Sequence, residues 1–453
     1  MLKVLLISTH YYKGSWSGAC PVPPIGLGYI AATLQKDGHA ISLCDLCFKD
    51  KDDISNIIHR AITESDPEVI GFSIRNIDNT LYLMSEFYIP FVKEIVEYCR
   101  LYTDAEIVFG GAGFSIMPEE ILYYCKADIG IVGEGEYSFS KLLRKMETGE
   151  DISTVQGIIF IKDGVVVQNN PQYIENLDDI PFPSRELYDK EYYGSNRITK
   201  MGINRARESI QTKRGCSLSC IYCTYPNIEG CKIRLRSPRK VVDEMELISK
   251  EYGIEDIEIV DSIFNIPVEH SKEICEEIIR RNIKIKWISC LNPGFVDEEL
   301  LSLMKKAGCI RVEFGSDSAS PKILKNLLKK FDQDAIIWAS NLCKEIGLPY
   351  SHYIMIGGPG ENFHTVEETL ITMERIDPTD ILVTPGIRIY PRTQLAEMSR
   401  REGYIKEHED LLAPHYYFSK DIDEKIIGLF EQYSKSHLNW HFVTIDNLKE
   451  LLC

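Results

Sequence analysis

Hydrophobic and polar positions alternate in blocks along the first 150 residues. Short runs rich in Val and Ile predict buried strands, and the segments between them repeat their apolar residues at the three- and four-residue spacing of a helix. The predicted strands cover residues 3–8, 40–44, 69–73, 106–110 and 129–132, and the predicted helices cover 27–37, 53–64, 81–101, 118–124 and 137–146. This alternation predicts a doubly wound parallel sheet of the flavodoxin or Rossmann type for residues 1–150.

The same alternation returns after residue 206 and continues to residue 390. A short run at 208–212 is followed by predicted strands at 257–260, 286–289, 311–314, 350–356 and 380–384. Helical periodicity marks the segments 238–252, 271–281, 298–307, 335–346 and 366–375. The pattern predicts about six consecutive strand–helix units in a second α/β domain.

Two other segments lack this alternation. Residues 151–205 combine a predicted hairpin, whose turn is Lys162-Asp163-Gly164, with a linker punctuated by prolines. Residues 391–453 mix polar and aromatic positions and predict a small C-terminal extension, which either packs against the second domain or closes a substrate site. The predicted domains are therefore 1–150, 206–390 and the extension, joined by the hairpin and linker.

Composition narrows the class of protein. A chain of 453 residues favours two or three domains, and 44% hydrophobic with 26% charged residues is typical of a soluble protein without a transmembrane segment. The net charge of −17 argues against a broad nucleic-acid surface. The first residues predict a strand rather than a secretory signal, so the 14 cysteines are expected as reduced thiols and metal ligands of a cytoplasmic protein.

Polar and glycine-rich segments follow the predicted strands of the first domain. They are Ser8-Thr9-His10, Ser73-Ile74-Arg75-Asn76, the run from Gly110 to Ser115, and Gly133-Glu134-Gly135-Glu136. Any one glycine among them is typical of a turn. Because ligands bind at the carboxyl ends of strands in parallel sheets, four such segments together indicate a ligand site.

Three cysteines, Cys216, Cys220 and Cys223, follow the short run at 208–212 with the spacing Cys-x3-Cys-x2-Cys. Soft thiolates at this spacing favour an iron–sulfur cluster in which three irons are bound by protein and one stays open. Structural thiols or part of a zinc site are the alternatives. A zinc site would require a second pair of ligands, and no such pair follows downstream.

The cysteine spacing, with the aromatic Tyr222 before the last cysteine, resembles the radical S-adenosylmethionine (SAM) superfamily. The resemblance implies a partial (β/α)6 barrel and a [4Fe-4S] cluster on the three cysteines. It also implies that SAM binds the fourth iron and is cleaved to a 5′-deoxyadenosyl radical. Expected SAM contacts lie at strand ends, namely Tyr222, Glu313, Ser316, Gly357 and Gly358, and the segment 261–265 is expected to face SAM or substrate.

The first domain resembles the cobalamin-binding domain that precedes many radical SAM domains. The resemblance rests on the run from Pro23 to Gly28, then Gly110-Gly111, then Gly133 to Glu136. It implies cobalamin without a lower histidine ligand, because no Asp-x-His-x-x-Gly motif occurs, and His10, His39 and His59 lack that context. The expected cobalamin contacts are Ser73, Arg75, Asn76, Gly110, Gly111, Ser115, Gly133, Glu134, Gly135 and Glu136.

Together the two resemblances imply a cobalamin-dependent radical SAM enzyme, with methylation of an unactivated carbon in a small-molecule or lipid-type substrate as the expected reaction. A reducing partner such as flavodoxin or ferredoxin is implied as well. Cyclisation or rearrangement without net methyl transfer is an alternative within the family, and a cobalamin-binding sensor or carrier is an alternative outside it. A tRNA methylthiotransferase is disfavoured by the acidic charge and the missing additional cluster cysteines.

Overall fold

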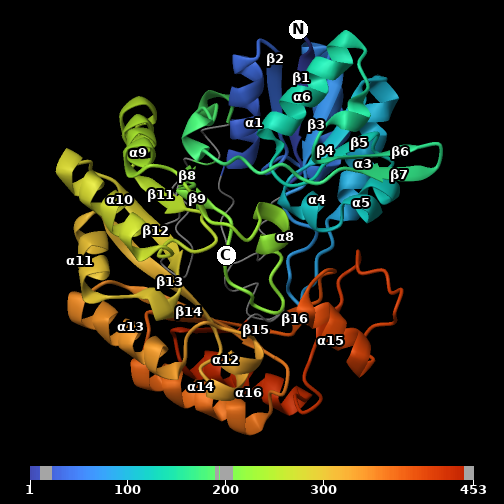
Figure 1. Cartoon of the computed structure of the whole chain (residues 1–453). Helices are drawn as coiled ribbons and strands as arrows, with labels where there is room; N and C mark the ends of the chain where they lie inside the picture. The colour runs from blue at the N-terminus through green and yellow to red at the C-terminus, as the bar shows by residue number, and fades with distance from the viewer. Residues whose placement is uncertain (11–22, 189–192, 194–207, 443–453) are drawn as a thin grey trace. The chain divides into compact units, whose positions relative to one another are not determined.

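The computed structural model describes residues 1–10, 23–188, 193 and 208–442. The described residues form two compact units (Figure 1). Unit 1 consists of the described residues of Met1–Asn79, Glu86–Ser195 and Asn227–Gly230, and unit 2 consists of those of Thr80–Ser85, Asn196–Pro226 and Cys231–Cys453. No helix in the described ranges is long and apolar enough to cross a lipid bilayer.

Unit 1 contains a sheet with the strand order β2-β1-β3-β4-β5-β6-β7. Neighbours from β2 to β5 are parallel, whereas β6 and β7 are antiparallel additions. The predicted parallel sheet is therefore confirmed, and the predicted hairpin extends it as β6 and β7. The strands are β1 (Lys3–Ser8), β2 (Ala40–Asp45), β3 (Val69–Ser73), β4 (Glu106–Gly110), β5 (Ile129–Ile131), β6 (Ile158–Lys162) and β7 (Val165–Gln168).

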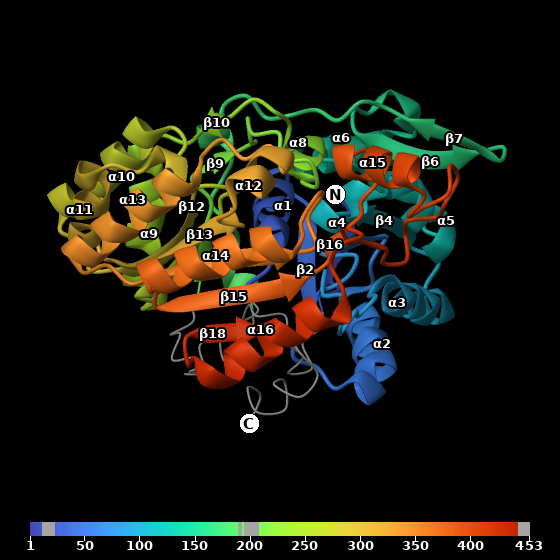
Figure 2. The same ribbon diagram turned by 90° about the horizontal axis from the view of Figure 1, so that it is seen from below.

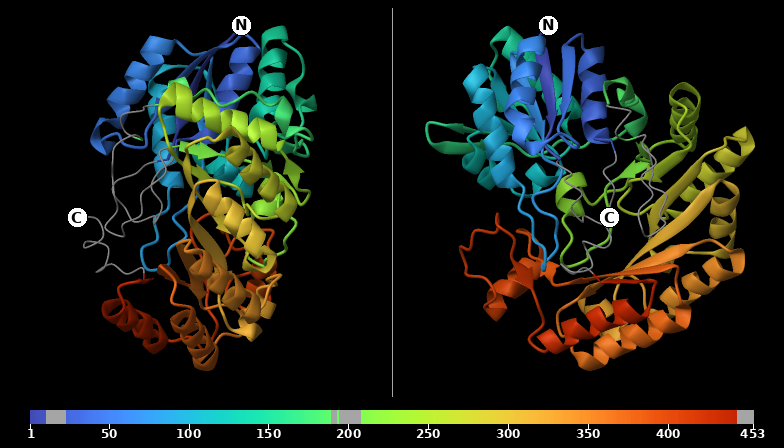
Figure 3. Two further views of the ribbon diagram at one scale, coloured as in Figure 1. Left: turned by 90° about the vertical axis from the view of Figure 1, so that its left-hand side faces the viewer. Right: turned by 180° about the vertical axis from the view of Figure 1, so that it is seen from behind.

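Helices cover both faces of this sheet (Figure 3). On one face α1 packs beside α6, and on the other α3 packs between α2 and α5. Leu27 and Leu34 of α1 meet Phe139 and Leu142 of α6 in a buried core over the strands. The helices are α1 (Ile25–Lys36), α2 (Ile54–Ser65), α3 (Ile89–Tyr102), α4 (Ala112–Ile116), α5 (Pro118–Cys125) and α6 (Gly135–Thr148).

The predicted helix at 81–101 is wrong at its beginning. Helix α3 starts at Ile89, directly before Pro90, whose fixed φ and missing N–H suit a first helical turn. The residues before it pair as an extended arm, in which the Asn79 N–H donates to the carbonyl of Glu86 and the Tyr88 N–H donates to Ile77. Residues between Asn79 and Glu86 therefore lie in an arm closed by backbone pairing and not in a helix.

Unit 2 contains a second sheet, in which every strand is parallel to its neighbours, with the order β18-β15-β14-β13-β12-β11-β8. All six predicted strands form, and the helices between them lie on the outer face of an open, curved sheet (Figure 1). The strands are β8 (Glu208–Ile210), β11 (Asp256–Ile259), β12 (Lys286–Leu291), β13 (Cys309–Asp317), β14 (Tyr350–Ile356), β15 (Asp380–Pro385) and β18 (Trp440–Phe442).

The outer layer of unit 2 confirms the five predicted helices and adds one from the tail. They are α9 (Pro238–Tyr252), α10 (Val268–Arg281), α11 (Glu298–Lys306), α13 (Gln333–Ile346), α14 (Phe363–Ile376) and α16 (Glu424–Ser436). Shorter elements lie at the strand ends, namely α8 (Tyr225–Glu229), α12 (Pro321–Asn326), α15 (Gln394–Glu402), β9 (Lys213–Arg214), β10 (Arg234–Leu235), β16 (Ile387–Arg388) and β17 (Tyr416–Tyr417).

The C-terminal extension contributes a seventh strand to this sheet, and the sequence did not predict it. Strand β18 pairs with β15, and the two run side by side in Figure 2. The ring of Trp440 meets the rings of Phe430 and Tyr433 from α16. His441 shares a hydrogen bond of 2.8 Å with Asp380, which also forms a buried ion pair with Arg311 of β13. Residues 443–453 of the extension lie outside the described residues.

Alternation along the strands sends apolar side chains outward against the helices. Val312 and Phe314 of β13 belong to the core cluster between sheet and helices, whereas Glu313 between them faces the other way. Trp287 of β12 is fully buried in this cluster, lies edge-on to Phe264 with ring centroids 5.3 Å apart, and donates from Nε1 to the Ala307 carbonyl at 2.9 Å. Burial on this face therefore holds the strands in register.

Replacing Trp287 with Ala is expected to lower the free energy of unfolding of unit 2 by about 3–5 kcal/mol, because it leaves a cavity and an unpaired carbonyl. The matched control is Trp338→Ala, since Trp338 is 57% exposed on α13. Urea unfolding followed by circular dichroism compares the two variants. Equal, small losses of stability in both would show that this core does not hold the sheet.

Candidate active site

The cysteine loop follows β8 and β9, at the carboxyl end of the first strand of unit 2. Cys216 is buried, and Cys220 and Cys223 are half-buried. The loop turns tightly, with the Cys223 N–H donating to the Cys220 carbonyl at 3.1 Å. Two later segments also bond to the loop backbone. The Ile221 N–H donates to the Leu327 carbonyl at 3.3 Å, and the Ile221 carbonyl accepts from the Leu395 N–H at 2.9 Å.

These thiols fit a cubane cluster better than a single ion. Across the described part of the chain, no group of three or more His, Cys, Asp or Glu side chains converges to hold one metal ion. A cubane requires no such convergence, because each thiolate binds a different iron. Burial raises the pKa of Cys220, and it raises the pKa of Cys223 to about 12, with the other loop cysteines adding to both shifts. Cluster binding would therefore displace protons from these thiols.

Asp261 supports the segment that leads into the loop. Its carboxylate accepts from the backbone N–H groups of Thr212 and Lys213, at 2.7 and 3.4 Å, and from the Thr212 hydroxyl. Burial raises the pKa of Asp261, whereas nearby Lys213 lowers it. The sequence predicted that the segment beginning at Asp261 faces SAM or substrate. In the structure the Asp261 carboxylate instead joins the end of β11 to the start of the cysteine loop.

Tyr222 and Glu313, two predicted SAM contacts, both lie near β13. The Tyr222 hydroxyl donates to the carboxylate of Asp317, which ends β13. Glu313 lies on the inner face of the sheet, where its Oε2 is 3.7 Å from the Cys290 sulfur of β12. Burial raises the pKa of Glu313, and Arg311 opposes the shift. Both side chains therefore remain on the side of the sheet where a cofactor is expected.

Ser316, a third predicted SAM contact, lies on the opposite face. Its hydroxyl is fully buried and shares a 2.7 Å hydrogen bond with Nδ1 of His352, whose Nε2 lies 3.1 Å from the Ser340 hydroxyl on α13. Burial lowers the pKa of His352 to about 3, so the ring is neutral. Ser316 therefore joins the sheet to its helices and is not among the residues that the structure brings to the cysteine side.

Gly357 and Gly358 form the turn that ends β14, and Glu361 holds it. The N–H groups of Gly357 and Gly358 donate to Oε2 of Glu361 at 2.5 and 3.0 Å. Gly357 has φ of +108°, and a Cβ there would come within 2.9 Å of the Phe418 ring. Sequence reasoning did not assign Glu361 or Phe418 to the site. A carboxylate three residues after a glycine pair was an available signal for Glu361, whereas nothing local indicated Phe418.

The predicted cobalamin edge of unit 1 is built from small residues in register. Ser73 pairs with Ser8 on one side and Gly110 on the other. Gly111, with φ of +99°, follows, and a Cβ there would lie 2.7 Å from the Ile74 carbonyl oxygen. Ser73, Gly110 and Gly111 are half-buried, while Arg75 and Asn76 are exposed. Small strand ends beside exposed polar groups fit a bulky planar cofactor such as a corrinoid.

Other residues predicted to bind cobalamin are engaged within unit 1. The buried Ser115 hydroxyl donates to the Gly111 carbonyl and accepts from the Gly133 N–H, both at 2.9 Å. Buried Glu134 accepts from the Ile174 N–H at 2.6 Å and fixes the linker. Gly135 lies against Ile30, and Glu136 is buried in the first turn of α6. Ser115, Glu134 and Gly135 thus contact other residues of unit 1, and Glu136 is buried there.

His10 also lies near this edge, at the end of β1. Burial and the Arg75 guanidinium lower the pKa of His10 to about 4, so its imidazole is neutral. No cobalt-ligand motif surrounds His10 in the sequence. Its burial and its proximity to Arg75 depend on contacts between distant segments, which the sequence alone did not indicate.

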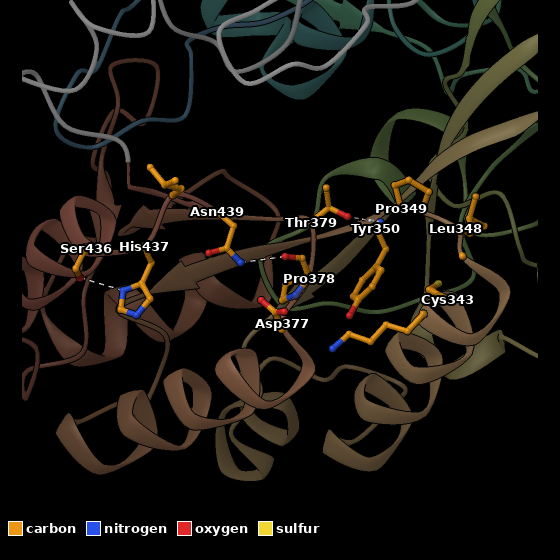
Figure 4. A pocket seen from close by; sticks show the side chains of 13 residues that line it. Cys343, Leu348, Pro349, Tyr350, Asp377, Pro378, Thr379, Ser436, His437 and Asn439 are labelled. Atoms are coloured by element: carbon orange, nitrogen blue, oxygen red, sulfur yellow. Dashed lines mark hydrogen bonds between the residues drawn. The ribbon is translucent and has the colours of Figure 1, made fainter.

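One hollow in unit 2 lies at the amino end of the strands, away from the cysteine loop (Figure 4). It has a volume of about 710 Å³ and is lined by residues that precede β14, β15 and β18, among them Pro349, Asp377, Thr379 and Asn439. Their polar groups bond to one another, as when Asn439 donates to the Pro378 carbonyl at 3.0 Å. Reactive groups of such folds gather at the carboxyl ends of strands, so this hollow is distinct from the candidate site.

Comparison with known families decides between the possible roles of the cysteine loop. Residues 210–372 match the radical SAM superfamily, and residues 19–143 match the B12 binding domain family. The chain therefore combines a radical SAM domain with a B12 binding domain. The radical SAM domain implies SAM and a [4Fe-4S] cluster, and the B12 binding domain implies cobalamin.

Several relatives of this radical SAM enzyme carry methyltransferase names, and others are named as anaerobic magnesium-protoporphyrin IX monomethyl ester cyclases. An uncharacterized methyltransferase of Pyrococcus horikoshii is 28% identical over 83% of this chain and 78% of its own length. Tryptophan 2-C-methyltransferase of Streptomyces laurentii is 25% identical over 83% of this chain and 72% of its own. The solved radical SAM methyltransferase TsrM of Kitasatospora setae shares the fold, with a TM-score of 0.83 over 97% of this chain and 91% of its own at 24% identity.

The buried carboxyl of Glu361, which holds the turn at Gly357 and Gly358, should make the free energy of unfolding depend on pH. Burial raises its pKa from 4.5 to about 7, and its Oε1 is buried without a hydrogen-bond partner in the described residues. The folded protein thus holds a proton that the unfolded chain releases near pH 4.5. The stability from this group is complete below pH 4.5 and is lost as the pH rises through about 7.

The Glu361→Gln variant should lack this loss. Between pH 6 and pH 8 its free energy of unfolding should fall by about 1 kcal/mol less than that of the wild type. Chemical denaturation at both pH values measures the difference, and Glu345→Gln, which changes an exposed carboxyl on α13, is the control. A Glu361→Gln variant with the wild-type pH dependence would contradict the assignment.

Proposed function

We propose that this enzyme transfers a methyl group to an unactivated carbon of a small-molecule or lipid-type substrate. The observation that carries the proposal is the three-cysteine loop at the carboxyl end of β8, in a chain that also has a B12 binding domain. When bound, the cluster and SAM supply hydrogen-atom removal, and cobalamin supplies a methyl carrier. The methyltransferase names of the relatives support this reading.

The residues of the chain serve this function by positioning. Cys216, Cys220 and Cys223 would hold the cluster, and Tyr222 is fixed by its hydrogen bond to Asp317. Gly357 and Gly358, held by Glu361, offer a turn without side chains against which a nucleoside can lie. Glu313 lies on the same side of the sheet. No step requires a paired acid and base, which agrees with radical chemistry.

In unit 1 we assign cobalamin to the edge formed by Ser73, Gly110 and Gly111, with Arg75 and Asn76 beside it. Ser115 and Glu134 support this edge through their backbone contacts. The electron for the cluster would come from a small electron-donor protein such as flavodoxin or ferredoxin. The domain limits proposed for these roles are 1–150 for cobalamin and 206–390 for SAM, with 151–205 as connector and 391–453 as extension.

A labelling experiment tests the proposed reaction. Full-length protein, purified without oxygen and supplied with cobalamin and a reductant, is incubated with SAM carrying a deuterated methyl group and a cell extract. Mass spectrometry should find a product that carries the deuterated methyl group. Cys231→Ala, which removes an exposed cysteine outside the loop, should retain the transfer, and Cys220→Ala should abolish it.

Two results would contradict the proposal. Deoxyadenosine formed without any labelled product would point to cyclisation or rearrangement. Label transfer that survives in Cys220→Ala would show that the loop has no part in the reaction.

A further inference from the structure

A buried pair of opposite charges lies against the cysteine loop, with Asp317 at the end of β13 and Lys329 on the segment that follows α12. Lys329 and Asp317 form an ion pair of 2.6 Å, and each side chain is only 7% exposed. The same segment touches the loop backbone, because the Leu327 carbonyl accepts from the Ile221 N–H at 3.3 Å. The pair is thus fixed to the loop by the main chain as well as by side chains.

The backbone around the pair adopts conformations that L-residues rarely use. Asp317 has φ of +63° and Leu328 has φ of +57°. Left-handed conformations at residues other than glycine are costly and persist where surrounding contacts enforce them. Asp317 is itself a member of the ion pair, and Leu328 directly precedes Lys329. The fold therefore holds these two charges in place at a conformational cost.

Tyr222 connects the pair to the cysteines. Its hydroxyl donates to Asp317 and lies 3.5 Å from Nζ of Lys329, which also lies 5.9 Å from the centre of the Tyr222 ring. In the chain, Tyr222 stands between Cys220 and Cys223. Two charges of opposite sign therefore lie beside the loop that carries the sulfur atoms assigned to the cluster.

Charges this close to an iron–sulfur cluster alter its reduction potential, because the reduced cluster carries one more negative charge than the oxidised cluster. Low local polarity strengthens the effect, since burial excludes the water that would screen it. A neighbouring cation favours the reduced form and raises the potential, and a neighbouring anion does the opposite.

We propose that Lys329 raises and Asp317 lowers the reduction potential of the cluster on Cys216, Cys220 and Cys223, with Tyr222 fixing their distance from it. Both are positioning residues, since neither bonds to the cluster. The inference rests on the cluster that the proposed function assigns to this loop. The electron comes from the external reductant, and no covalent bond forms or breaks in this step.

Reduction potentials of variants test the inference. Full-length protein reconstituted with iron and sulfide is titrated with dithionite, without SAM, and followed by electron paramagnetic resonance. Lys329→Met should shift the potential to a more negative value, and Asp317→Asn should shift it to a more positive value. Lys329→Arg, which keeps the positive charge, should have a potential close to that of the wild type. Lys330→Met removes an exposed charge from the next residue and should leave the potential unchanged.

Iron and sulfide contents separate this role from a structural one. If the pair only supports the loop, Lys329→Met and Asp317→Asn both lose cluster, and the cluster that remains keeps its potential; this result would overturn the inference. Shifts of the same sign in both variants would overturn it too.

Cluster lost in Lys329→Met but retained in Lys329→Arg would support the role of charge. Wild-type protein that transfers methyl groups while no variant changes the potential would overturn this inference alone, whereas wild-type protein without a cluster would overturn the proposed function as well.

Discussion

The buried carboxylate of Asp261 fixes where the cysteine loop begins on the sheet of unit 2. It accepts hydrogen bonds from Thr212 and Lys213, which lie between β8 and Cys216, while its own backbone follows β11. A carboxylate buried among backbone donors has few alternative positions, because moving it would leave several polar groups unsatisfied. The loop therefore begins at a defined place on the sheet, and every assignment to its cysteines depends on that place.

The loop is held from three further directions. Leu327 and Leu395 bond to the backbone of Ile221, and Asp317 bonds to the hydroxyl of Tyr222. These partners come from the ends of later strands or the segments after them, so the parallel order of β8, β11, β12 and β13 brings them together. The same order places the turn at Gly357 on the same edge of the sheet. A fold of repeated strand–helix units thus gathers short segments from distant parts of the chain around three thiols.

The sequence predicted this architecture because hydrophobic periodicity reports which elements form and in which class of sheet they pair. It failed where periodicity was ambiguous. The apolar residues from Leu81 to Phe87 suit a helix by spacing, yet they form an arm that ends at the helix start before Pro90. Strand β18 is too short for a clear pattern, and its pairing with β15 depends on contacts of Trp440 and His441 with residues far away in the chain.

Within the site, the sequence predicts most clearly the residues whose spacing is itself the signal, above all the cysteines. It was less successful with single polar residues at strand ends. Ser316 lies on the same face as Val312 and Phe314, so two-residue alternation along β13 already placed it toward the helices. The roles of Asp261, Lys329 and Glu361 arise from hydrogen bonds to backbone groups and side chains, several of them brought near only by the fold. Apart from the position of Glu361 shortly after the glycine pair, no pattern in the sequence indicated these partners.

The central claim is that three cysteines leave one iron of the cluster open to SAM. Electron–nuclear double resonance on the reduced full-length protein, with SAM labelled with nitrogen-15 at its amino group, tests it most directly. The account predicts a hyperfine coupling between the labelled nitrogen and the cluster spin. The absence of this coupling, in a sample where equilibrium dialysis shows that SAM is bound, would contradict it.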